Sequence, residues 1–202
     1  MSFLVLGFFT GLSLILAIGA QNIFVIEQGL KKQYVFLVCL ICSISDLILI
    51  FLGIFLFEYF KIYFTKNVEL FFNISLFIFL IYFIYNKVRS LYKSSDISFG
   101  NNALSLKSVI VKTLGFTYLN PHVYSDTVFF LGNFSKSFSI EQKYLFGIGA
   151  SIASFIFFFT LGYLSKYLSN YLIDKKIWKI INFIIIIFMS FLAFYVLTNI
   201  LK

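Results

Sequence analysis

The sequence predicts an all-α integral membrane protein, a six-helix transmembrane bundle built as a 3+3 inverted repeat with broken first and fourth helices. Three observations lead to this prediction. The chain of 202 residues is 61% hydrophobic, whereas soluble domains are about 45–50% apolar. Long apolar segments follow one another along the chain, and the last three resemble the first three. A water-soluble core cannot bury this much apolar surface, so lipid must cover part of it.

Six segments are apolar enough for membrane helices, which need about 20 residues each. They are residues 3–26, 34–57, 68–85, 108–132, 144–165 and 177–199. The longest polar loop separates the third segment from the fourth. We therefore expect one transmembrane domain over residues 1–202, with a first repeat at 1–86, a cytoplasmic linker at 87–107 and a second repeat at 108–202.

Basic residues predict how the bundle lies in the membrane, because Lys and Arg concentrate in cytoplasmic loops. Of the 16 Lys and Arg residues, 11 fall in one set of alternate loops. They are Lys31, Lys32, Lys87, Arg89, Lys93, Lys107, Lys112, Lys166, Lys175, Lys176 and Lys179. This set predicts a cytoplasmic side, with both termini outside. If the first segment were re-entrant, there would be five crossings and a cytoplasmic N-terminus.

The two halves of the chain share three short motifs in the same order. "KQYVF" at Lys32 returns as "QKYLF", "CSISDLI" at Cys42 as "ASIASFI", and "NISLFIFL" at Asn73 as "NFIIIIFM". The offsets are 110, 108 and 109 residues. Because each half has an odd number of spans, the second copy would be inverted relative to the first, as in many transporters.

Two apolar segments are interrupted at corresponding places in the two halves. The first holds Gly19 and Ala20 before two amides, and the fourth holds Pro121 after Asn120. Proline removes a backbone donor and clashes with the preceding turn. Polar groups inside an apolar segment are costly without partners, and paired interruptions of this kind mark transport sites. We therefore expect a substrate site where these breaks meet, in a single transporter domain.

Two carboxylates lie at membrane depth, Asp46 and Asp126. A charge at the bilayer centre costs at least about 2.5–3.5 kcal/mol, so such residues face the bundle interior. Asp46 aligns with Ser154 in the repeat and Asp126 with Val25, so each half supplies one acid. Both are candidates for binding a cationic substrate and for proton coupling. The alternatives are a structural hydrogen bond for Asp46 and an interfacial position for Asp126.

Polar side chains beside the breaks complete the expected substrate site. Gln21, Asn22 and Asn120 offer amide donors and acceptors, and Tyr124 offers a hydroxyl. They can bind the ends of a zwitterion, and a helix N-terminus favours its carboxylate. Capping of the broken helix ends is an alternative role for the amides, and packing is one for Tyr124. His122, the single histidine, is expected to cap rather than relay protons.

Other residues do not suggest catalysis or metal binding. We interpret Cys39 and Cys42 as small packing residues within a span, and Glu27 with Lys31 as an exposed helical ion pair. No phosphate loop, zinc cluster or catalytic triad is present in the sequence. We expect no enzyme activity, no cofactor and no metal. The net charge of +8 reports membrane topology and does not indicate nucleic acid.

The motifs around the breaks resemble those of a known family. "IGAQNIFVIEQG" and "TYLNPHVYSDT", followed by "GASIASFIFFF" and "WKIINFIIIIFMSFLAF", are similar in order to the lysine/arginine exporter family, the LysE-type translocators. The likeness covers essentially the whole chain and is nearest to the bacterial arginine exporter branch. It differs at Ala20, where the family pattern has proline. The resemblance implies export of arginine, lysine or both through the bacterial inner membrane.

Electrostatics then suggests how such export would be driven. Moving a cation outward against an inside-negative potential costs about 2.3 kcal/mol per 100 mV, so we expect proton-coupled antiport. We expect alternating access by rocking of one repeat against the other. The alternatives are export of neutral amino acids of the homoserine and threonine type, or of a divalent metal cation. The expected partners are the basic amino acid, protons and the lipid bilayer, with a possible homo-oligomer.

Overall fold

The protein, seen here in a computed structural model, is almost entirely helical in its described part. The structure describes residues 2–16, 19–63, 65–92, 104–120, 123–169 and 175–201, and 89% helix content leaves no strand among them. The elements are α1 (Phe3–Ile15), α2 (Ala20–Leu30), α3 (Val35–Tyr63), α4 (Lys66–Tyr92), α5 (Leu106–Tyr118), η1 (Tyr124–Phe130), α7 (Leu131–Ser135), α8 (Ile140–Leu168) and α9 (Lys175–Ile200).

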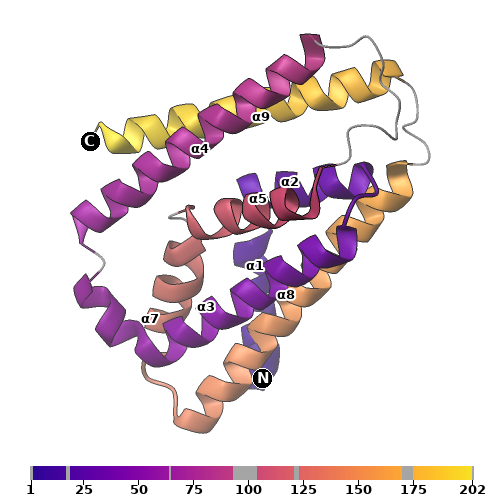
Figure 1. The fold of residues 1–202 in the computed structure, drawn as a ribbon. Coiled ribbons are helices and arrows are strands. Elements are labelled where there is room, and N and C mark those ends of the chain that lie inside the picture. The colour runs from indigo at the N-terminus through magenta and orange to yellow at the C-terminus, as the bar shows by residue number, and fades with distance from the viewer. Residues whose placement is uncertain are drawn as a thin grey trace.

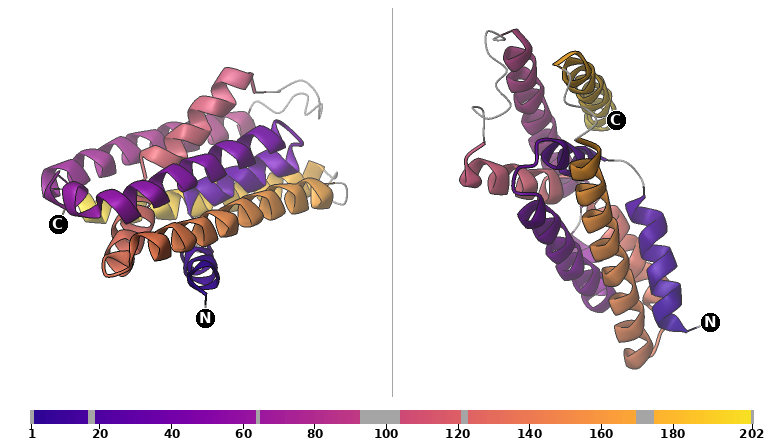
Figure 2. Two further views of the ribbon diagram at one scale, coloured as in Figure 1. Left: turned by 90° about the horizontal axis from the view of Figure 1, so that it is seen from below. Right: turned by 90° about the vertical axis from the view of Figure 1, so that its right-hand side faces the viewer.

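Helices from the two halves of the chain pack against each other (Figures 1 and 2). The long helices α3 and α8 lie side by side, and α4 pairs with α9. Helix α1 packs along α8, while η1 and α7 pack along α3. The short helices α2 and α5 contact each other and lie on α8 and α3, respectively. This pairing brings the two expected breaks into the same part of the molecule.

The first break separates α1 from α2, whose axes differ by 83°. Gly19 is the N-cap of α2 with φ −115° and ψ −177°, an extended conformation that any residue adopts. The side-chain amide of Asn22 donates to the carbonyl of Ile15 at 3.2 Å. An amide of the opening stretch therefore satisfies a carbonyl at the end of α1, one of the groups that a helix end leaves without a partner.

The second break separates α5 from η1. The Tyr124 hydroxyl donates to the carbonyl of Tyr118 at 2.9 Å, across the break. Beyond it the chain forms a π-helix, a wide turn that is frequent at functional sites. Pro121 and His122, expected to break and cap the helix here, lie outside the described residues.

Three described helices have the length and apolar character to cross a membrane alone, within 35–57, 66–85 and 140–168. The bent pair α1 and α2 adds a fourth candidate if it is one span. The apolar stretch found in α9 is shorter, and the expected fourth segment is divided among α5, η1 and α7. The described lengths therefore support several membrane-spanning helices, and six crossings stay a prediction.

Side-chain exposure fits a lipid-facing bundle. Phe191 and Phe194 on α9 and Ile78 on α4 are each more than 60% exposed, a feature expected where lipid replaces water. Helix α4 also runs on to Tyr92, into the segment predicted as a linker from residue 87, and residues 93–103 lie outside the described part. Cys39 and Cys42 are free thiols with no exposure in the core, as the packing interpretation predicted.

Glycines set the closest helix contacts. A Cβ on Gly7 of α1 would collide with the backbone of Phe146 on α8, and one on Gly149 of α8 with the backbone of Leu4. A Cβ on Gly53 of α3 would lie 2.6 Å from the carbonyl of Thr127 in η1. Small residues allow this backbone approach in membrane bundles, and the Gly53 contact fixes where η1 lies.

Candidate functional site: a cavity where the two helix breaks meet

A cavity of about 240 Å³ lies between the two breaks. It is walled by the end of α1, the first turn of α2, the middle of α3, the second break, and side chains of α4, α8 and α9. The lining residues are Leu14, Ile15, Gly19, Ala20, Gln21, Asn22, Asp46, Leu76, Leu80, Asn120, Val123, Asp126, Thr127, Phe158, Leu192, Tyr195 and Val196. Both halves of the chain therefore contribute to one chamber.

Most of the residues predicted for the substrate site line this chamber. Five of the six are Gln21, Asn22, Asp46, Asn120 and Asp126, and the helix-break residues Gly19 and Ala20 join them. The sixth, Tyr124, is not among the lining residues, and its hydroxyl bonds the backbone across the break. The packing role that was the alternative for Tyr124 fits this position better than substrate contact.

Asp46 lies on α3 at its contact with α8. Its side chain is 3% exposed, and Ser154 on α8 donates a hydrogen bond to its Oδ2 at 2.8 Å. A hydroxyl donor stabilises the ionised form of a buried carboxylate but supplies no positive charge. Asp46 therefore combines the structural hydrogen bond that was its alternative role with a position on the cavity wall.

Asp126 lines the cavity from the π-helix η1, in the second half of the chain. It is partly buried, and the neighbouring Thr127 donates its hydroxyl to the carbonyl of Val123 at 2.5 Å. A π-turn leaves carbonyl groups displaced from the α-helical ladder, and the threonine hydroxyl satisfies one of them. Val123, Asp126 and Thr127 therefore face the chamber together.

The amides at the first break have different environments. Asn22 is held by its bond to Ile15, whereas Nε2 of Gln21 is buried and has no hydrogen-bond partner among the described residues. A buried donor without a partner costs about 1–3 kcal/mol. The first turn of α2 adds backbone N–H groups and the positive end of a helix dipole.

The remaining wall is apolar and was not predicted. Leu76 and Leu80 come from α4, and Leu192, Tyr195 and Val196 come from α9. In the sequence these helices are uniformly apolar spans, and a residue that faces a cavity cannot be told from one that faces lipid. Sequence offered no signal for this part of the site.

The chamber can hold a small molecule that carries both charge and hydrocarbon. Two carboxylates suit a cation, the N-terminus of α2 suits an anion, and the leucines suit methylene groups. Among the described residues no group of three or more His, Cys, Asp or Glu side chains is placed to hold a metal ion. Buried acids and amides at paired helix breaks, in an apolar bundle, define a membrane transporter rather than an enzyme.

Comparison with known proteins identifies the family. The model of the LysE type translocator family matches residues 12–200, and the chain belongs to this family.

Several relatives align over most of their length. The chain is 33% identical over 196 residues to a putative amino-acid transporter YggA of Aeromonas salmonicida, covering 93% of this chain and 91% of the relative. It is 31% identical over 191 residues to the arginine exporter protein ArgO of Pectobacterium atrosepticum, covering 89% and 88%. It is 32% identical over 191 residues to ArgO of Salmonella typhimurium, covering 93% and 90%. No solved structure matches the chain.

Proposed function

We propose that this protein exports the basic amino acids arginine, lysine or both from the cytoplasm through the bacterial inner membrane, by proton-coupled antiport with alternating access. One observation carries the proposal. Asp46 and Asp126 come from opposite halves of the chain, yet both line the cavity that the two helix breaks enclose. Two acids in a chamber within an apolar bundle need a cation or protons to offset their charge.

The cavity wall supports a specific way of binding a basic amino acid. The guanidinium or ammonium group would pair with Asp46 or Asp126, and the α-carboxylate would accept from the first turn of α2 and from Gln21. Leu76 and Leu80 would cover the methylene stem. The names of the relatives, arginine exporters and an amino-acid transporter, favour the same substrate class.

Charge balance supports proton coupling. An acid that binds the substrate cation when ionised releases it when protonated, so one carboxylate can serve both ligands in turn. Exchange of one inward proton for one outward cation moves no net charge. The pH gradient then drives export, and the cost of about 2.3 kcal/mol per 100 mV for the cation is cancelled.

Helix packing supports the 3+3 inverted repeat. In the order of the chain, α1 of the first half corresponds to α5, and α2 corresponds to η1 and α7. Exchanging the halves therefore turns the contact of α1 with α8 into that of α5 with α3, and the contact of α2 with α8 into those of η1 and α7 with α3, and all of these contacts are present. The α3–α8 and α4–α9 pairs map onto themselves. A Cβ on Gly53 of α3 would lie 2.6 Å from Cα of Val128, and one on Gly162 of α8 would lie 3.6 Å from Cγ1 of Val25, behind closer groups of Cys39 and Val35. Each long helix therefore has a glycine at the matching position where the broken segment of the other half approaches.

Basic residues support the proposed orientation. The end of α2 and the start of α5 lie at the same end of the molecule, as do the ends of α4 and α8 (Figure 1). Lys31, Arg89, Lys107 and Lys166 belong to these helix ends. We place this end in the cytoplasm, which puts α1 and α9 with their free ends on the opposite side.

Counterflow in proteoliposomes tests the proposal. Vesicles loaded with arginine, lysine, threonine or buffer would be diluted into labelled arginine. We expect uptake with arginine or lysine inside, and none with threonine or buffer. Exchange with threonine would favour the neutral amino-acid alternative, and no exchange under any condition would contradict the proposal. A divalent cation is the weaker alternative, because the described residues offer no three-ligand group.

A further inference from the structure

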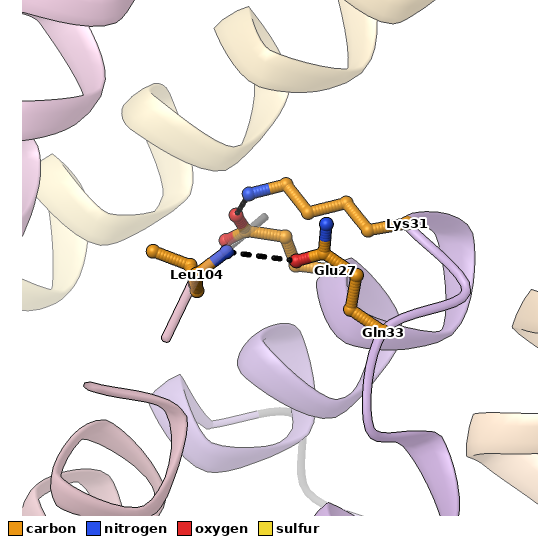
Figure 3. Close-up of polar contacts among 4 residues, drawn as sticks. All are labelled: Glu27, Lys31, Gln33 and Leu104. Carbon is orange, nitrogen blue, oxygen red and sulfur yellow. Dashed lines mark hydrogen bonds and ion pairs between the residues drawn. The ribbon is translucent and has the colours of Figure 1, made fainter. Parts of the chain in front are cut away.

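A third acid, Glu27, is buried outside the cavity. The i,i+4 spacing to Lys31 predicted an exposed pair, but Glu27 is only 2% exposed. Nζ of Lys31 lies 2.5 Å from its Oε1 (Figure 3). A buried carboxylate in contact with an ammonium group is costly to assemble without a purpose, and the proposed function leaves it unused.

Glu27 lies on the path from the cavity to the basic end of the molecule. Along α2 the order is Gln21 and Asn22 at the cavity, then Phe24, then Glu27. With a rise of 1.5 Å per residue, Glu27 is about 7.5 Å beyond Asn22. Helix α5 runs toward the cavity through the same kinds of residue: the charged Lys112 comes first, then the aromatic Phe116, and then Asn120 at the cavity.

An aromatic layer separates the cavity from Glu27. The ring of Phe116 lies 5.2 Å from that of Phe24, 4.7 Å from Phe79 and 5.1 Å from Phe83. A Cβ on Gly115 would lie 2.8 Å from the Phe79 ring, so this glycine permits the approach. Phe24 and Phe116 are at most 1% exposed. The layer closes the space between α2, α4 and α5 on this side of the cavity.

Charged groups form the next layer. Lys112 was counted among loop residues, but it lies within α5, half-buried, with Nζ 6.0 Å from the centre of the Phe83 ring. The charges of Glu27 and Lys31 both act on Lys112, the carboxylate favouring its charged form and the ammonium opposing it. Beside them, Oε1 of Gln33 accepts a hydrogen bond from the backbone N–H of Leu104 at 3.3 Å (Figure 3). This bond ties the α2–α3 connection to the start of α5.

We propose that Glu27 is an entrance site for the side-chain cation of a basic amino acid, and that Lys31 of the protein itself occupies this site in the present conformation. The inference rests on the proposed function. Lys31 presents a primary ammonium on a four-carbon stem, which is the chemistry of the lysine side chain that would be carried. The substrate cation displaces Lys31, which loosens α2 from its charged layer and lets Phe24 leave Phe116.

Exchange kinetics of variants in proteoliposomes test this site. Lys31→Met removes the internal competitor and keeps the stem, so the half-saturating concentration of arginine should fall about threefold or more. Glu27→Gln should raise it. When Glu27→Gln is already present, adding Lys31→Met should not lower the half-saturating concentration of arginine. Lys107→Met is the matched control, since Lys107 is exposed at the start of the neighbouring helix, and it should leave the value unchanged.

Amine labelling of the wild-type protein gives a second measurement that needs no variant. The Lys31 side chain is 25% exposed, and added arginine should raise its labelling rate, with Lys107 unchanged. An unaltered rate would overturn the proposal, as would a Lys31→Met variant whose half-saturation stays at the wild-type value. Lower thermal stability without a change in half-saturation would show that the pair is only structural.

The two proposals fail in different ways. If the wild-type protein exchanges no basic amino acid, the proposed function is wrong. If the wild-type protein exchanges arginine and Asp46→Asn does not, while the Lys31 and Glu27 variants keep wild-type half-saturation, only the entrance site is wrong.

Discussion

Ser154 and Asp46 form a hydrogen bond of 2.8 Å between α8 and α3, and they are 108 residues apart in the chain. This separation is one of the offsets that relate the two halves of the sequence. A residue can meet its own counterpart only close to the axis that relates the two copies. In the proposed inverted repeat, the acid of the cavity wall therefore lies where the halves meet, and its counterpart is the residue that donates a hydrogen bond to it.

We predict that Asp46→Asn abolishes arginine exchange while the protein keeps its fold. Asparagine has the same shape and still accepts from Ser154, but it carries no charge to pair with a cation. Exchange in proteoliposomes should fall by at least about 30-fold, as for a lost buried charge pair worth about 2–5 kcal/mol. Ser154→Ala is the control, because it keeps the charge and should retain measurable exchange. Normal exchange by Asp46→Asn would remove this acid from the site.

We predict that Asp126→Asn weakens the binding of basic amino acids more than that of neutral ones. The substitution removes one of the two negative charges on the cavity wall and leaves the volume unchanged. The half-saturating concentration of arginine should rise at least about 10-fold. Competition by lysine and by threonine against labelled arginine measures the change in preference. Equal losses for both competitors would mean that Asp126 shapes the cavity without selecting charge.

Two glycine substitutions should distinguish a glycine needed for helix packing from one that lies at the cavity. Gly53→Ala places a methyl group 2.6 Å from Cα of Val128, and overpacking of this kind costs about 1–3 kcal/mol. Among the described residues, the methyl group of Gly19→Ala meets only Nδ2 of Asn120, at 4.0 Å. Thermal unfolding in detergent should show a lower midpoint for Gly53→Ala and an unchanged one for Gly19→Ala. A destabilised Gly19→Ala would show that the first break depends on glycine.

Imposed gradients should identify the coupling. With one proton per arginine, a pH gradient should drive arginine accumulation in proteoliposomes, and a potassium diffusion potential should have no effect. With two protons, the potential adds about 2.3 kcal/mol per 100 mV. Vesicles without protein set the background. Arginine movement that responds to neither gradient would contradict antiport.

The polar part of the site was predictable because polar residues inside apolar spans are conspicuous. Asp46, Asp126 and the amides at the breaks were identified from sequence, and the structure brings them to one cavity. Tyr124 was placed there by proximity in sequence, but the bond to Tyr118 turns its hydroxyl to the backbone. A two-residue step around a helical turn is enough to redirect a side chain.

Other features depend on tertiary contacts that sequence does not encode locally. The burial of Glu27 arises because α3, α5 and α8 pack on α2, and an i,i+4 ion pair has the same spacing whether exposed or covered. Tyr195 and Leu192 face the cavity from a helix that is apolar on every side. The sequence of the π-helix at 124–130 contains no turn residue that would predict it.

The glycine contacts between α1 and α8 have a mechanical consequence. Backbones that touch at Gly7 and Gly149 leave no room for one helix to tilt without the other. Helix α1 then moves together with α8, a helix from the opposite half. In the same way, η1 moves together with α3 through the contact at Gly53. The halves of the polypeptide are thus interlocked. The bodies that shift during a transport cycle would each be assembled from pieces of both halves, which differs from the expected rocking of one whole repeat against the other.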